Sequence, residues 1–178
     1  MATVVIYPAG AGTYTEFPTV YPEGIKHYEA LARDGVGYVG SGQASGAVID
    51  TFTFEQTGLA GTISNVTISC TIYGRYAYSD SSTKTKVGGT WYDGSTHTVG
   101  YTTSTYTESY NTSPKTSILW TWAEINAIDA GVSLTAESAQ YPAWEGTDTA
   151  RLTDIYITVT YTPCLVKGNP AVGFYGVL

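Results

Sequence analysis

The sequence offers few side chains suited to catalysis. Its two histidines, His27 and His97, are the first candidates for acid–base chemistry. His97 lies in Gly-Ser-Thr-His-Thr-Val, surrounded by hydroxyl groups. Ser and Thr are so frequent in this chain that their proximity to a histidine selects no nucleophile. No Gly-x-Ser-x-Gly motif, which would hold a hydrolase serine on a sharp turn, occurs. We therefore expect no Ser/His/Asp catalytic site and place His97 on the surface or in a hairpin.

Phosphate, acid–base and metal sites receive no better support. The glycine-rich run 37–46 lacks the Gly-Lys-Ser/Thr ending of a phosphate-binding loop. The fifteen Asp and Glu residues could meet in space as a glycosidase pair, but no spacing selects one. No Cys-x-x-Cys or Cys/His spacing is typical of zinc. The sequence thus predicts a protein that is not an enzyme, with no cofactor and no metal.

The two cysteines do not define a disulfide framework. Cys70 falls on the apolar side of a predicted strand, and Cys164 follows a proline. We expect a buried free Cys70, and a Cys70–Cys164 bridge is the alternative.

Composition limits the partners. The formal net charge is −7, and the eight Lys and Arg residues are scattered, so neither nucleic acid nor an anionic membrane is an expected partner. Only 13% of residues are charged, whereas 16 Tyr and 20 Gly are present beside many Thr and Ser. This mixture favours pleated strands joined by tight turns.

Apolar residues alternate with polar ones over most of the chain. The clearest strands are 62–72 and 151–162, each with one apolar and one polar face, as in an antiparallel sheet. We expect further strands at 3–7, 48–54, 84–91, 97–101 and 103–110, with a loop at 79–83 and a hairpin turn at Asp93-Gly94. The pattern over 9–48 is loose, with a short strand around Tyr38 and a turn or two of helix at 25–33. The resulting fold class is all-β: an antiparallel, jelly-roll-like β-sandwich with one short helix.

That helix is predicted at 122–129. Thr121 and Glu124 have capping-box spacing, and Trp120 and Ile125 occupy the positions of a hydrophobic staple. Gly131 lies just beyond, where a left-handed C-cap is favourable. A helix this short needs tertiary packing.

Four segments, taken in order, resemble a β-sandwich module of virion structural proteins of tailed bacteriophages. They are Asp-Thr-Phe-Thr-Phe, Gly-Thr-Ile-Ser-Asn-Val-Thr-Ile, Trp-Thr-Trp-Ala-Glu-Ile-Asn-Ala-Ile-Asp-Ala-Gly-Val-Ser-Leu and Arg-Leu-Thr-Asp-Ile-Tyr-Ile-Thr-Val-Thr-Tyr. The similarity covers about residues 48–162. It implies a non-enzymatic structural protein: a capsid decoration (cement) protein, or a tail or fibre component. Its expected partners are copies of itself, in a ring or trimer, and other virion proteins.

The first residues lack the basic start and long apolar core of a secretory signal, so we expect synthesis in the host cytoplasm and a place on the virion surface. A mature secreted form remains the alternative. Residues 1–162 are predicted to form the sandwich and 163–178 an arm that packs on a neighbour or folds back on its own domain. The arm's candidate contact residues are Pro163, Val172, Phe174, Tyr175, Val177 and Leu178.

The rival function is a carbohydrate-binding module. Sandwiches of this kind bind sugars through exposed aromatic side chains, and the alternative for each such residue is packing in the core. The candidate aromatic contact surface consists of Trp91, Tyr92, Tyr106, Tyr110 and Trp144. Glycan binding and a virion role are compatible with each other.

Overall fold

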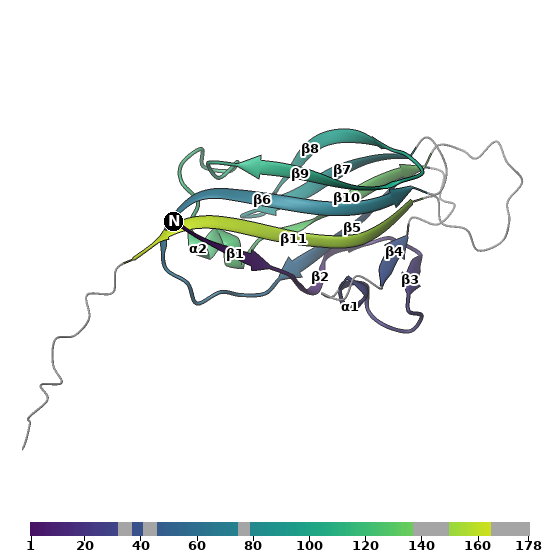
Figure 1. Ribbon diagram of the computed structural model, residues 1–178, viewed down its shortest axis with the longest axis horizontal. Coiled ribbons are helices and arrows are strands. Elements are labelled where there is room, and N and C mark those ends of the chain that lie inside the picture. The colour runs from purple at the N-terminus through teal and green to yellow at the C-terminus, as the bar shows by residue number, and fades with distance from the viewer. Residues whose placement is uncertain (32–36, 41–45, 75–78, 137–149, 165–178) are drawn as a thin grey trace, which may run out of the picture.

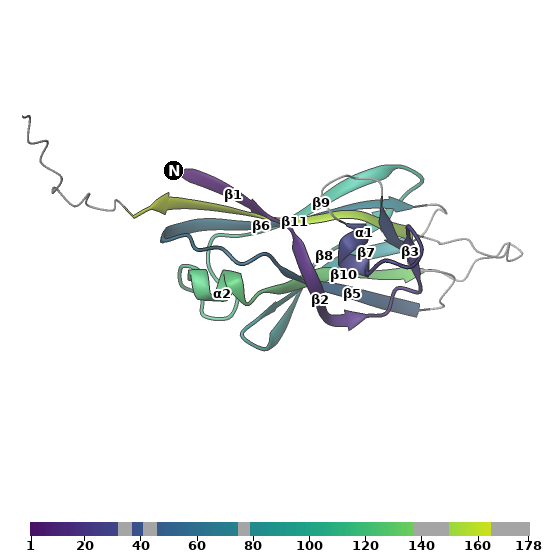
Figure 2. The same ribbon diagram turned by 90° about the horizontal axis from the view of Figure 1, so that it is seen from below.

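A computed structural model describes residues 1–31, 37–40, 46–74, 79–136 and 150–164. Two antiparallel sheets face each other as a sandwich, which confirms the predicted fold class (Figures 1 and 2). Sheet A contains, in spatial order, β3 (Thr19–Tyr21), β4 (Tyr38–Gly40), β11 (Ala150–Pro163), β6 (Gly61–Gly74) and β9 (Thr103–Tyr110), with β1 (Ala2–Ile6) paired to the far half of β11. Sheet B contains β2 (Pro8–Thr15), β5 (Gly46–Phe54), β10 (Asp129–Ala136), β7 (Ser79–Val87) and β8 (Thr90–Val99).

The period-two pattern of the sequence explains the core between the sheets. From sheet A, Ile68 and Cys70 of β6 and Ile155 of β11 are fully buried. From sheet B, Phe52 of β5 and Val132 of β10 meet them. Cys70 is a free, buried cysteine and Cys164 a free, exposed one, so the bridge between them is excluded. Burial raises the pKa of the Cys70 thiol, which keeps it protonated.

The predicted helix is shorter than expected. Helix α2 spans Trp122–Asn126 and has the predicted capping box, because Glu124 N donates to Thr121 Oγ1 at 3.2 Å while Thr121 N donates to the Glu124 carboxylate at 2.8 Å. The C-cap is Ala127, so the prediction of Gly131 as C-cap is wrong. Gly131 instead lies in β10, where a Cβ atom would collide with the backbone of Asp50. It is therefore needed for close strand approach.

Two other sequence predictions are wrong. Residues 79–83 belong to strand β7 rather than to a loop. The hairpin between β7 and β8 turns at Gly88 and Gly89, whose φ angles are 54° and 90°, and not at Asp93-Gly94, which lies inside β8. Gly88-Gly89 accommodates positive φ at both positions, which is what a tight hairpin of this hand requires.

The first half of the chain contains more structure than its sequence pattern predicts. Strand β2 is absent from the prediction, as is β3, whereas the strand around Tyr38 is confirmed as β4. Within the expected helical turn, α1 spans His27–Ala30 and packs against β2, β3 and β4. Figure 2 shows α1 at one side of the sandwich, near β3 and the β2 end of sheet B. The arm predicted at 163–178 begins in β11 with Pro163, and its remaining contact residues lie outside the described residues.

Candidate functional site

The outer face of sheet A is the first candidate surface. Side chains alternate along each strand, and directly paired residues on neighbouring strands point to the same face. The fully buried residues and their strand partners therefore point inward, and the residues between them point outward. The outward set is defined by register and comprises Tyr21, Tyr38, Tyr73, Thr67, Ser69, Thr71, Thr103, Thr105, Thr107, Ser109, Arg151, Asp154, Tyr156, Thr158 and Thr160. Arg151 and Asp154 are the charged members of this set. No described helix or strand lies over this face (Figures 1 and 2).

A stack of planar groups stands at one edge of that face. The rings of Tyr21 and Tyr38 are stacked, with centroids 5.4 Å apart and 12° between their planes. The guanidinium carbon of Arg151 lies 4.0 Å from the centre of the Tyr38 ring. Tyr21 is 49% exposed because β3 is the last strand in the order of sheet A. A rigid aromatic surface with a polar tip is thus presented to solvent.

Hydroxyl groups cover the rest of the face. Thr71 Oγ1 lies 2.9 Å from Thr105 Oγ1, and Thr67 Oγ1 lies 2.8 Å from Ser109 Oγ, so neighbouring strands are linked by hydroxyl pairs. Each hydroxyl can both donate and accept, which leaves capacity for a further partner. Such a surface can bind polar, neutral groups in many orientations.

Asp154 is the acid of this face. It follows a bulge between Leu152 and Asp154, where Thr153 Oγ1 donates to Thr71 O at 3.1 Å. The carboxylate is half-buried, and this burial raises its pKa against the effect of the Ile155 amide, which donates to it.

Of the five aromatic residues predicted as a contact surface, the four that the structure describes do not share one outer face. Trp91 lies on the outer face of sheet B, 5.3 Å from the Tyr14 ring and beneath Lys86 Nζ at 5.4 Å. Tyr92, Tyr106 and Tyr110 instead pack against the core. Trp144 lies outside the described residues.

The inward position of Tyr106 has a clear physical reason. Strands β9 and β8 are the edges of the two sheets, and their facing side chains close the gap between the sheets. Tyr106 stacks on His97 at 4.5 Å and donates from its hydroxyl to Thr98 O at 3.2 Å. The predicted strand at 103–110 is confirmed as β9, in which Tyr106 and Tyr110 face the interior and the threonines face solvent.

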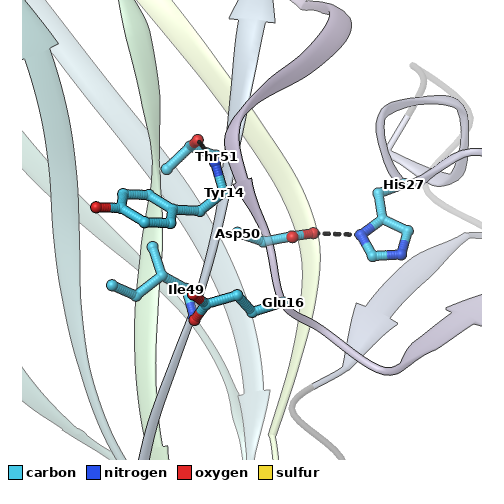
Figure 3. A network of polar contacts seen from close by, with 6 residues as sticks. All are labelled: Tyr14, Glu16, His27, Ile49, Asp50 and Thr51. Carbon is cyan, nitrogen blue, oxygen red and sulfur yellow. Dashed lines mark hydrogen bonds and ion pairs between the residues drawn. The ribbon is translucent and has the colours of Figure 1, made fainter.

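A carboxylate–imidazole pair is the second candidate site. Asp50 of β5 is fully buried, and its Oδ2 lies 2.6 Å from Nδ1 of His27 on α1 (Figure 3). The hydrogen bond to Asp50 raises the pKa of His27, and burial raises the pKa of Asp50. Backbone amides of Phe17 and Glu16 act in the opposite direction on Asp50. The contact joins α1 to β5 and thereby holds the helix against sheet B.

The residue pattern only weakly indicates Tyr21, Tyr38 and Asp154 as site residues. Tyr21, Tyr38 and Asp154 come from a proline- and glycine-rich region and from a bulge, where alternation is interrupted. The pairing of Tyr21 with Tyr38 depends on the register of β3 with β4, which residue spacing in strands of three residues does not show.

Among residues 1–31, 37–40, 46–74, 79–136 and 150–164, no three His, Cys, Asp or Glu side chains are grouped to hold a metal ion. The helices of this same part of the chain are all too short or too polar to cross a membrane.

Comparisons with known proteins give no family. No protein-family model matches the chain, and no curated protein does. Among solved structures, it is similar to the C-terminal CBM6 of a marine laminarinase from Zobellia galactanivorans, with 11% identity over 89% of this chain and 99% of that one, at a TM-score of 0.41. It is also similar to a CBM35 from Cellvibrio japonicus, with 12% identity over 90% and 95% of the two chains and a TM-score of 0.42. These scores are too low to transfer a function, and neither match supports the resemblance to a virion module.

Proposed function

We propose that this protein is a non-catalytic, glycan-binding β-sandwich whose ligand lies on the outer face of sheet A. One observation carries the proposal: the stacked Tyr21–Tyr38 pair, with Tyr21 49% exposed, stands at the edge of a face rich in hydroxyls. The C–H groups on one side of a sugar ring are apolar and stack on an aromatic ring. The sugar hydroxyls then require donors and acceptors beside that ring.

The sheet supplies both requirements on a rigid element. Tyr21 pairs with Tyr38 in the strand ladder, so the ring position is fixed by backbone hydrogen bonds rather than by a loop. Tyr38 is held in turn by Arg151, whose guanidinium covers its ring at 4.0 Å. A side chain ordered before binding loses little entropy when the ligand arrives.

A Tyr21→Ala substitution tests the proposal. We expect it to weaken glycan binding about tenfold or more, which corresponds to about 1.4 kcal/mol. A glycan array identifies the bound sugar, and isothermal titration calorimetry measures its affinity for both proteins.

The matched control is Tyr14→Ala. Tyr14 belongs to an aromatic pair of nearly the same spacing, 5.3 Å from Trp91, on the outer face of sheet B. We expect this variant to retain full affinity. The proposal is wrong if no glycan binds, or if the two variants lose affinity equally.

A virion structural role, as implied by the sequence resemblance, is a second proposal. Ile118 and Leu119 are apolar neighbours that are 64% and 51% exposed, and contact with another protein would remove them from water. They lie in the segment between β9 and α2, at the end of the sandwich where β11 also ends (Figure 1).

Light scattering with multi-angle detection tests this second proposal. An assembling protein should form a defined oligomer, and Ile118→Ser/Leu119→Ser should return it to a monomer. A wild-type protein that is monomeric at all concentrations and does not bind phage particles would contradict it. Deletion of 163–178 in the same assay tests the predicted arm.

A further inference from the structure

One row of the sheet A register crosses five strands. Tyr21 of β3 pairs with Tyr38 of β4, and the register of β4 with β11 places Tyr38 opposite the bulge that precedes Asp154. Asp154 pairs with Thr71 of β6, which pairs with Thr105 of β9. Neighbouring strands are about 4.8 Å apart, so four intervals give a row about 19 Å long. A single sugar ring would cover only a fraction of it.

The two ends of this row differ in chemistry. Tyr21 and Tyr38 form the aromatic end, where a sugar ring can stack on the exposed part of the Tyr21 ring. The other end consists of the Asp154 carboxylate followed by the Thr71–Thr105 hydroxyl pair at 2.9 Å. An ionised carboxylate only accepts hydrogen bonds, with about four lone-pair positions on its two oxygens. Sugar hydroxyls are the matching donors.

Asp154 is suited to accept hydrogen bonds from uncharged groups of a ligand. In the described part of the chain it forms no ion pair, and the Ile155 amide is the group that donates to it. A half-buried carboxylate without a cation repels a carboxylate or sulfate on a ligand more strongly than an exposed one, because water screens it less. The formal charge of −7 on the chain adds to that repulsion.

We infer that the ligand of this face is an extended, neutral oligosaccharide lying across the strands, stacked on Tyr21 at one end and donating hydroxyl hydrogen bonds to Asp154 further along. This inference rests on the proposed glycan-binding function and adds the class of ligand and its direction. Arg151, the positively charged residue of the face, contacts the Tyr38 ring. Its charge is the one feature in the described part of this face that would favour anionic sugars instead.

The test is a titration with two series of ligands. One series contains neutral oligosaccharides, from monosaccharide to hexasaccharide, of the linkage that binds best on the array. The other contains oligogalacturonates of the same lengths. We expect affinity for the neutral series to rise at least about tenfold with length and then level off, and the oligogalacturonates to bind at least about tenfold more weakly.

Asp154→Asn is the decisive variant. It removes the charge while keeping the shape, so we expect several-fold weaker binding of the neutral hexasaccharide and stronger binding of the oligogalacturonates. Asp93→Asn, which alters a 64% exposed carboxylate on sheet B, is the matched control and should change neither. Thermal melting of both variants checks that they are folded.

The outcomes separate the two proposals. Binding that depends on Tyr21 but not on ligand length, or that favours oligogalacturonates in the wild-type protein, overturns this inference and leaves the glycan-binding function in place. An unchanged preference in Asp154→Asn overturns the role of Asp154. Absence of any glycan binding, or binding that does not depend on Tyr21, overturns both.

Discussion

No described helix or strand lies over the outer face of sheet A, whereas residues 12–14, an irregular part of β2, lie over part of the outer face of sheet B. Thr13 donates to Asp129 Oδ2 from its backbone N at 2.9 Å and from its hydroxyl at 2.5 Å. Tyr14 N donates to Thr51 Oγ1 at 3.1 Å. Lys86 Nζ donates to Thr13 Oγ1 at 3.0 Å. Asp129 Oδ2, Thr51 Oγ1 and Lys86 Nζ of sheet B are thus bonded to the protein itself.

Both faces have an aromatic pair, at 5.4 Å on sheet A and 5.3 Å on sheet B. The pair Tyr14–Trp91 attaches the covering segment to the sheet, while Tyr21 is left 49% exposed. An aromatic pair therefore indicates a binding surface only where part of a ring is exposed to solvent and the polar groups beside it are still able to form hydrogen bonds. Four predictions test this difference, from the largest effect to the smallest.

The largest effect is expected at the border between the two sheets, where His27 on α1 meets Asp50 of β5. His27→Ala leaves a fully buried carboxylate without its partner, so we expect a loss of about 3–5 kcal/mol in the free energy of unfolding. Urea unfolding measures it. The double variant His27→Gln/Asp50→Asn, which replaces the pair by neutral hydrogen-bonding groups, should recover part of the loss. A change below about 1 kcal/mol in His27→Ala would show that the pair contributes little.

The next effect concerns the covering segment of sheet B. Asp129 is 7% exposed and accepts both hydrogen bonds from Thr13. We expect Asp129→Ala to cost about 2–3 kcal/mol of stability because two bonds to a charged group are lost. Glycan affinity at low temperature should stay the same. A matching loss of affinity in calorimetry would mean that the ligand uses sheet B.

A pH dependence should follow from the His27–Asp50 pair. The pKa of His27 is raised in the folded protein by its hydrogen bond to Asp50, so the folded state holds its proton more tightly than the unfolded state. The resulting stability is complete below the unfolded pKa of about 6.5 and is lost as pH rises through the folded value, by at most about 1.4 kcal/mol per pH unit. The raised pKa of Asp50 acts in the same direction at lower pH.

Thermal melting between pH 5.5 and 9 measures this slope. His27→Gln should flatten the part above about pH 6.5, since glutamine does not titrate. Stability that rises with pH over this interval in the wild-type protein would contradict the assignment.

The smallest effect is expected for the ion pair between Lys84 and Asp93, whose N and O atoms are 2.7 Å apart. Asp93 is 64% exposed, so its interaction is screened by water. Asp93→Ala should cost less than about 1 kcal/mol. A loss as large as that of Asp129→Ala would show that exposure does not distinguish Asp93 from Asp129.

Much of the fold could be predicted because alternation acts locally. Strands β6 and β11, the capping box of α2 and the β-sandwich class follow from residue spacing alone. The hairpin was misplaced because Asp93-Gly94 and Gly88-Gly89 both have turn-forming sequences, and strand pairing selected the second. Strands β3 and β4 are three residues each, too short to show a period.

The candidate site could be predicted least. Sequence alternation indicates that Tyr106 and Thr107 point to opposite faces but not which face is inward, because either choice satisfies the period. The pairing of β9 with β6 and the contact of Tyr106 with β8 decided it.

The sequence alone determined an all-β chain with low charge, a capped helix and many tyrosines, since these properties depend on residues a few positions apart. Only the tertiary structure decided which tyrosines are available to a ligand. Tyr21, Tyr38 and Asp154 are up to 133 residues apart in the sequence and meet because antiparallel pairing brings β3, β4 and β11 side by side. Exposure is a property of that assembly: Tyr14 and Trp91 on sheet B are half-buried, whereas Tyr21 on sheet A is exposed.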